Sequence, residues 1–198
     1  MTHMTSLFLA IFTLTTLASA KTETFKIDAT QTKVNWLASK KIGSSHSGAI
    51  QLKSGEIVLD NAKLTGGKLV MDMNTIQVTD IPASSADNGK LKGHLESNDF
   101  FSVKSNPEAT LVIKSVEQSA PSKANITGDL TIKGKTFPVT FPAEITVAKN
   151  AVTAKGKITV DRTKYDIKYN SADFFNLPVD KIINNTFEIS FEAKAQKM

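Results

Sequence analysis

Residues 126–147 carry the pattern that most restricts the fold, because apolar and polar residues alternate strictly in two runs joined by a short turn. Ile126, Leu130 and Ile132 share one parity before the turn at 133–135. After the turn, one parity is again apolar: Phe137, Val139, Phe141, Ala143, Ile145 and Val147. Successive side chains of a strand point to opposite faces, so the stretch is predicted to be a β-hairpin with one dry face.

Two prolines fall on the polar parity of the second run. Pro138 and Pro142 are therefore predicted to point away from the dry face. Proline has no backbone N–H to donate to a sheet ladder. The second strand is thus expected to lie at a sheet edge, to bulge, or to pair irregularly at these positions.

Most of the remaining chain alternates in the same way. Strands are predicted at 25–27, 34–39, 44–53, 55–60, 64–73, 110–116, 151–160 and 187–194. Residues 83–97 have few apolar side chains and are predicted to hold a short helix. Residues 170–183 are predicted to form a loop with one helical turn at 172–175.

About eight strands with one apolar face each can bury those faces as a sandwich of two sheets or as one closed barrel. The predicted strands are long, and Gly66 and Gly67 inside one of them indicate a bulge or bend of the kind that barrel closure needs. The fold class is therefore predicted as all-β, an eight-stranded antiparallel barrel with one or two short helices.

The composition excludes several classes of function. There is no cysteine, which excludes a disulfide framework, a Cys-ligated metal and a thiol nucleophile. The net charge is +5, but the basic residues are scattered singly among acidic ones, so no nucleic-acid partner is expected. Transient contact with an anionic membrane surface is the milder expectation from this charge.

The first twenty residues are predicted to be a signal peptide, followed by one barrel domain at 21–198. Residues 7–17 form an apolar run of eleven residues, too short to span a bilayer, and 18–20 read Ala-Ser-Ala, a small-x-small cleavage site. The expected location is the periplasm, with secretion as the alternative.

No motif of a familiar enzyme occurs in the chain. G-x-S-x-G, H-E-x-x-H, the P-loop and G-x-G-x-x-G are all missing. After residue 20 the chain has two histidines, His46 and His94, and no carboxylates at metal-ligand spacing beside them. The chain is therefore predicted not to be an enzyme, with no catalytic residues and no metal site.

Four local patterns together resemble the YceI family of exported bacterial proteins. G-x-L-x-x-x-D-F-F occurs at 93–101, G-D-L-T-I-K-G at 128–134 and D-R-T-K-Y at 161–165, and Phe174 and Phe175 follow. The similarity extends over roughly residues 24–195. It implies a lipocalin-like barrel with a hydrophobic pore that binds a polyisoprenoid, an isoprenoid quinone or another amphiphilic lipid, without any other cofactor.

These observations lead to a predicted function of non-catalytic lipid binding or transport, with the tail in the pore and the head near its mouth. The alternative is a structural or stress-related exported protein with a solid core and no ligand. A lipid-modifying enzyme and a protein-binding module are further alternatives, and a homodimer is left open. The candidate ligand contacts are Trp36, Lys41, His46, His94, Phe100, Phe101, Phe137, Val139, Phe141, Arg162, Tyr165 and Phe174.

Overall fold

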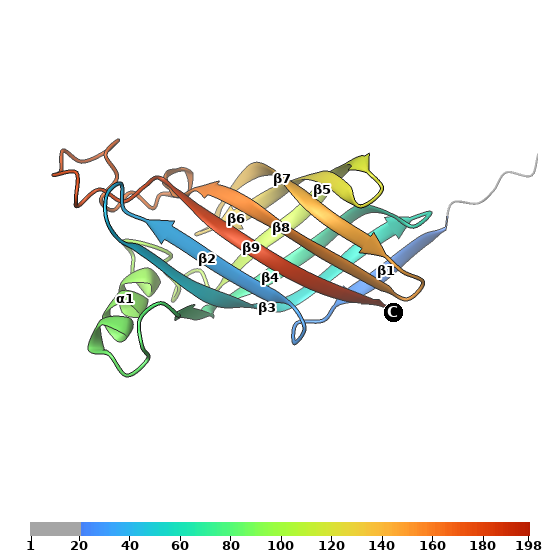
Figure 1. Ribbon diagram of the computed structural model, residues 1–198, viewed down its shortest axis with the longest axis horizontal. Coiled ribbons are helices and arrows are strands. Elements are labelled where there is room, and N and C mark those ends of the chain that lie inside the picture. Colours follow the sequence, from blue (N-terminus) through green and yellow to red (C-terminus); the bar gives the residue numbers. More distant parts are fainter. Residues whose placement is uncertain (1–20) are drawn as a thin grey trace, which may run out of the picture.

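The computed structural model describes residues 21–198, which form a closed antiparallel barrel with a helix at one end (Figure 1). The strands are β1 (Thr22–Ile27), β2 (Lys33–Ser39), β3 (Ser45–Asp60), β4 (Lys63–Val78), β5 (Glu108–Ala120), β6 (Lys123–Ile132), β7 (Lys135–Val147), β8 (Ala151–Asp161) and β9 (Thr186–Lys197). Helix α1 (Ala86–Glu96) follows β4, and the short 3-10 helix η1 (Arg162–Tyr165) follows β8. None of the helices described is long and apolar enough to cross a membrane.

The nine strands of residues 21–198 occupy eight positions around the barrel, which confirms the predicted fold class. Strands β1 and β2 share one position, because each pairs antiparallel with both β3 and β9. A turn at Asp28 separates them: its carboxylate accepts hydrogen bonds from the Thr30 hydroxyl (2.6 Å) and the Thr30 backbone N–H (2.9 Å). The Thr30 hydroxyl is the largest cause that lowers the pKa of Asp28. Pairing of β3 with β4 closes the ring.

Strand β3 is longer than predicted, since the two strands expected at 44–53 and 55–60 form one element. Its ladder with β4 changes register at three places, between Ala49 and Gln51, Leu52 and Ser54, and Val58 and Leu59. A bulge adds a residue on one side of a ladder and bends the strand. The long β3–β4 hairpin therefore curves around the barrel instead of breaking at Gly55.

Strand β7 is fully paired on one side only. The β6–β7 ladder runs from Ile132↔Lys135 to Lys123↔Glu144, whereas the β7–β8 ladder covers only Ala143↔Gly156 to Val147↔Val152. Pro138 and Pro142 both lie in the part without a β8 partner, and both are exposed. Of the three predicted alternatives, the structure shows the sheet edge, since the β6 ladder runs through both prolines without a register shift while the β8 side is unpaired there.

The helix predicted within 83–97 is α1, and it lies at one end of the barrel (Figure 1). The Ser85 hydroxyl caps its start by accepting from the Asp87 N–H. The side-chain amide of Asn88 donates to the carbonyls of Val78 (3.0 Å) and Ile81 (2.7 Å), which ties the helix to the end of β4. Leu95 is the buried residue of the helix and packs into the core.

Candidate functional site

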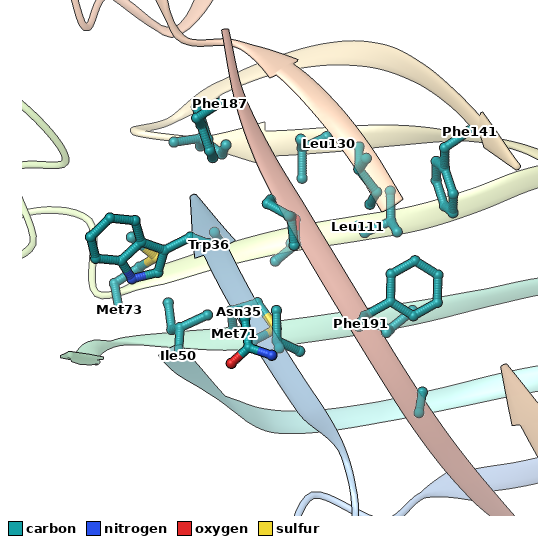
Figure 2. A pocket seen from close by; sticks show the side chains of 18 of the residues that line it. Asn35, Trp36, Ile50, Met71, Met73, Leu111, Leu130, Phe141, Phe187 and Phe191 are labelled. Atoms are coloured by element: carbon teal, nitrogen blue, oxygen red, sulfur yellow. The ribbon is translucent and has the colours of Figure 1, made fainter. Parts of the chain in front are cut away.

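The barrel interior contains an elongated cavity of about 200 Å³, lined by inward side chains of strands all around the ring. Figure 2 shows lining residues from several strands around it, among them Trp36, Ile50, Met71 and Leu111. At the end near α1, Leu95 and Phe100 line it, and at the other end Leu64 and Ile126 do. All four of these side chains are buried.

Strand β9 shows how far the cavity extends. Its consecutive inward residues all line the space: Phe187, Ile189, Phe191, Ala193 and Ala195. Residues 187 and 195 are eight steps apart, which corresponds to about 26 Å along an extended strand. The cavity is therefore long and narrow, with a shape that suits a chain-like ligand better than a compact one.

The wall of the cavity is almost entirely apolar. Arg162 is the one titratable residue among those that line it. Its guanidinium donates to the carbonyls of Ile167 (2.8 Å), Ile183 (3.0 Å) and Asn184 (3.0 Å). Burial lowers the pKa of Arg162, although nearby Asp161 acts in the opposite direction. The arginine thus holds the 166–185 loop onto the barrel end, and the wall offers a ligand apolar contact.

The Trp36 side chain extends over the adjacent strand β3, because its cross-strand partner there is a glycine. The indole N–H donates to the Gln77 carbonyl on β4 (3.1 Å), and the ring passes over Gly48 on the intervening strand β3. A Cβ at residue 48 would lie 2.6 Å from the ring and 1.7 Å from the Gln77 carbonyl oxygen. Gly48 therefore permits the close approach that places the indole beside the cavity.

An aromatic cluster covers the α1 end. The ring of His94 meets those of Phe100 (4.8 Å between centroids) and Tyr169 (4.6 Å) edge to face, and its Nε2 lies 3.1 Å from a carboxylate oxygen of Asp99. Phe101 meets Phe187 of β9 at 6.3 Å. These contacts join the helix, the turn after it and the 166–185 loop into one cover.

The structure brings five of the twelve sequence-predicted contacts to the cavity wall. They are Trp36, Phe100, Phe101, Phe141 and Arg162. Phe100 and Phe101 lie in a turn and not in a strand, so both reach the cavity, whereas adjacent strand residues would have pointed to opposite faces. Ligand contact by these residues stays a prediction.

Three more predicted residues point inward without lining the cavity. Phe137 and Val139 are half-buried on the part of β7 that lacks a β8 partner. The ring of Tyr165 packs edge to face on Phe137 at 5.3 Å and is fully buried. Burial, with a smaller effect of Asp161, raises the pKa of Tyr165 to about 12.

The remaining four predicted residues lie around the α1 end, outside the cavity wall. His94 belongs to the aromatic cluster described above, and Lys41 is an exposed residue of the β2–β3 turn. The Nδ1 of His46 lies 2.8 Å from Asp80, whose other oxygen accepts from the Ser47 N–H. Burial opposes ionisation of Asp80, but the Ser47 and His46 contacts outweigh it and lower its pKa. Phe174 is exposed, with the Lys168 ammonium 5.0 Å from its ring centroid.

Several lining residues were not among the predicted contacts. They are mostly aliphatic or thioether side chains of inward parity, such as Ile50, Leu69, Met71, Met73, Leu111 and Ile189. The alternation of their strands gave their inward direction. Nothing in the sequence distinguished those that face a cavity from those that fill a core.

Within residues 21–198, no three His, Asp or Glu side chains are placed to hold a metal ion.

An eight-position antiparallel barrel around a long apolar cavity defines a lipocalin-like barrel. The chain belongs to the YceI-like domain family, whose model matches residues 25–195. Among curated relatives, it is 34% identical over 110 residues to a UPF0312 protein of Pseudomonas putida (strain W619), covering 56% of this chain and 54% of the relative. A UPF0312 protein of Staphylococcus epidermidis is 35% identical over 113 residues, 52% of this chain and 63% of the relative. The matches thus span little more than half of these relatives' lengths.

Solved structures show the same fold at low sequence identity. BcnA of Burkholderia cenocepacia has a TM-score of 0.65 at 22% identity, covering 86% of this chain and 99% of that one. A polyisoprenoid binding domain from Saccharophagus degradans, implicated in plant cell wall breakdown, has a TM-score of 0.61 at 15% identity, covering 88% and 98%. The YCEI protein of Campylobacter jejuni has a TM-score of 0.55 at 17% identity, covering 98% and 94%.

Proposed function

We propose that this protein binds a linear, strongly apolar lipid such as a polyisoprenoid, with the tail in the barrel cavity and the polar head outside it, and that it performs no catalysis. The long apolar cavity carries this proposal. The structural similarity to a polyisoprenoid binding domain supports the same class of ligand.

The energetics of such a complex are sufficient without polar contacts. Burial of apolar surface contributes about 25 cal/mol per Å². A tail that buries several hundred Å² therefore gains on the order of 10 kcal/mol before the entropic cost of association. A wall that is almost entirely apolar favours tails that carry few polar groups.

The cavity is smaller than typical ligand pockets, which hold about 300–1,000 Å³. A long tail therefore needs side chains to move aside. Met71 and Met73 line the cavity, and methionine side chains are unbranched and adapt readily to irregular spaces. We infer that seating the tail enlarges the space by rearranging these residues.

The cavity favours a carrier over the alternatives. In a solid core, inward side chains such as Ile50 and Phe191 would be fully buried, whereas here they stay partly exposed to the cavity. A lipid-modifying enzyme would need reactive polar groups at the tail's end, and the one ionisable residue of the wall, Arg162, is engaged with three backbone carbonyls.

The proposal includes export to the periplasm. It rests on the apolar run at 7–17 and the Ala-Ser-Ala site that follows it, which lie outside the described residues. Cell fractionation with amino-terminal sequencing tests this part separately. A protein that begins at Lys21 and is released by osmotic shock is the expected result.

Lipid binding is tested by native mass spectrometry and lipid extraction on protein purified without detergent, followed by titration with a polyprenyl quinone. One bound lipid per chain is expected. The variant Ala193→Phe places a ring in the cavity and is expected to lose binding at least tenfold, while Gln196→Phe places the same ring on the exposed face of β9 and keeps it. Absence of both extracted lipid and quinone binding in the unmodified protein would refute the proposal.

A further inference from the structure

Apolar side chains gather at the α1 end of the molecule, outside the barrel. Ile42 of the β2–β3 turn is 58% exposed, and the 166–185 loop presents Phe174 (48%), Phe175 (49%) and Val179 (45%). In Figure 1 this loop projects beyond the barrel end next to the β2–β3 turn. Single exposed apolar residues are common, but a projecting group of four large ones is typical of an interaction surface. These four residues are called the apolar tip below.

The apolar tip is held in place by backbone hydrogen bonds. The Lys41 N–H donates to the Ile182 carbonyl (2.9 Å), and the Asn184 N–H donates to the Ser39 carbonyl (3.0 Å), so the turn and the loop are joined. The N–H groups of Phe174 and Phe175 both donate to the carbonyl of Ser171, which is completely buried. The rings are therefore presented to solvent by an anchored backbone.

Lysines surround the apolar tip. Lys168 lies over the Phe174 ring and pairs with Asp166 (2.8 Å), and Lys181 lies 3.6 Å from Asp180. Lys40 and Lys41 stand directly before Ile42, and neither forms an ion pair with the rest of residues 21–198. The turn thus adds two positive charges without an ion pair beside the apolar side chains, against one negative charge of the loop, Asp173, which accepts a hydrogen bond from the Asn185 amide.

The base of the same loop borders the cavity. Ile183 and Asn184 line it, together with Ile167 from the other end of the loop and Arg162 of the preceding η1. The apolar tip and the end of the cavity are therefore the outer and inner sides of one segment. A lipid tail that entered at this end would pass this loop and the α1 and turn residues that cover the same end with it.

We propose that the apolar tip inserts into the headgroup region of an anionic lipid bilayer. Aromatic and aliphatic side chains beside lysines bind such interfaces through combined apolar burial and attraction to anionic lipids. A second copy of the chain fits less well, because a two-fold contact through so small a tip would bring the Lys40 and Lys41 charges of both copies close together. Insertion of the apolar tip into a bilayer does not depend on the proposed lipid binding. Its purpose would be to exchange a lipid tail with the bilayer, and this purpose rests on the proposed function.

Docking is tested by sedimentation of the protein with vesicles of phosphatidylcholine and phosphatidylglycerol in a two-to-one ratio. The double variant Phe175→Ser/Val179→Ser is expected to lower the vesicle partition coefficient at least tenfold. Lys40→Gln is expected to lower it severalfold on these vesicles and not on pure phosphatidylcholine. The matched control Val147→Ser/Met198→Ser removes exposed apolar residues at other places in the molecule and is expected to leave binding unchanged.

Two further measurements distinguish a loss of vesicle docking from unfolding and from a loss of quinone binding. Circular dichroism checks that each variant is folded, and quinone binding in vesicle-free solution is expected to be the same for Phe175→Ser/Val179→Ser as for the unmodified protein. Failure of the unmodified protein to sediment with anionic vesicles overturns the docking proposal even if it binds quinone. A dimer in analytical ultracentrifugation that Phe175→Ser/Val179→Ser dissociates also overturns it, because the tip would then be a protein interface.

Discussion

Two groups of inward side chains in this barrel are similar in chemistry but differ in their surroundings. Phe25, Leu59, Val160 and Tyr165 are only 1–2% exposed and belong to the packed core. Ile50, Met71, Leu111, Phe187 and Phe191 are partly exposed because they face the cavity. Both groups point away from the solvent outside the barrel, yet only the first group is in contact with other side chains on every face.

Position along the strands accounts for part of this difference. Leu59 and Val160 lie at the ends of β3 and β8, where turns and η1 supply additional side chains to pack against. Met71 lies in the middle of β4, where the opposite wall is the only available partner. A barrel of eight strands is just wide enough for its interior to be filled by side chains or to hold one small ligand. In this protein both occur side by side, since Val160 is packed whereas its ladder partner Phe187, near the start of β9, lines the cavity.

The largest predicted effect on stability comes from replacing one leucine of each group by alanine. Leu59→Ala is expected to lower the free energy of unfolding by about 3 kcal/mol, because it creates a new void in a packed region. Leu111→Ala is expected to cost about 1 kcal/mol, since Leu111 already borders empty space and loses fewer contacts. Urea denaturation measures both, and equal losses would show that the cavity region is packed in solution.

Arg162 lies at the boundary between the packed end and the cavity. Arg162→Met is expected to lower the free energy of unfolding by about 2 kcal/mol, because three carbonyls lose their donor. Lys164→Met, in the same short helix but exposed, serves as the control and is expected to have almost no effect. Hydrogen exchange is expected to increase in the 166–185 loop of the Arg162 variant alone. Unchanged exchange there would contradict the anchoring role.

Tyr165 offers the smallest and most specific test of the packed group. Its hydroxyl is buried and has no hydrogen-bond partner within residues 21–198. Tyr165→Phe is therefore expected to leave stability at neutral pH unchanged or to raise it by up to about 1 kcal/mol. Arg162 and the described loop contacts remain in place in this variant.

The same substitution is also expected to change how the stability depends on pH under alkaline conditions. The pKa of Tyr165 is about 10 when unfolded and is raised to about 12 in the fold, so above pH 10 the unfolded state loses the proton first. The free energy of unfolding therefore keeps its full value below pH 10, where the phenol is neutral in both states, and falls as the pH rises toward 12. The stability difference between the unmodified protein and Tyr165→Phe is expected to change over this window. A difference that stays constant from pH 9 to 12 would show that the phenol is solvated.

Much of the fold was predictable because the pattern that encodes it is local. The alternation at 126–147 gave the hairpin and its dry face, and Pro138 and Pro142 correctly indicated a local sheet edge, since a missing N–H has a direct effect on the ladder. The helix expected within 83–97 was also found, as α1. The site was less predictable: Met71 and Leu111 show no local feature that separates a cavity wall from a core.

The order of residues was enough to show which strand side chains turn inward, because the two-residue period of a strand is a property of the backbone. Contacts between distant segments were needed to show that β1 and β2 share one position, that β3 continues through Gly55, and that Phe174 and Phe175 lie outside the barrel. These outcomes depend on pairings between segments far apart in the chain. The cavity depends on them as well, since its width is set by how many strands close the ring and not by the residues of any one strand.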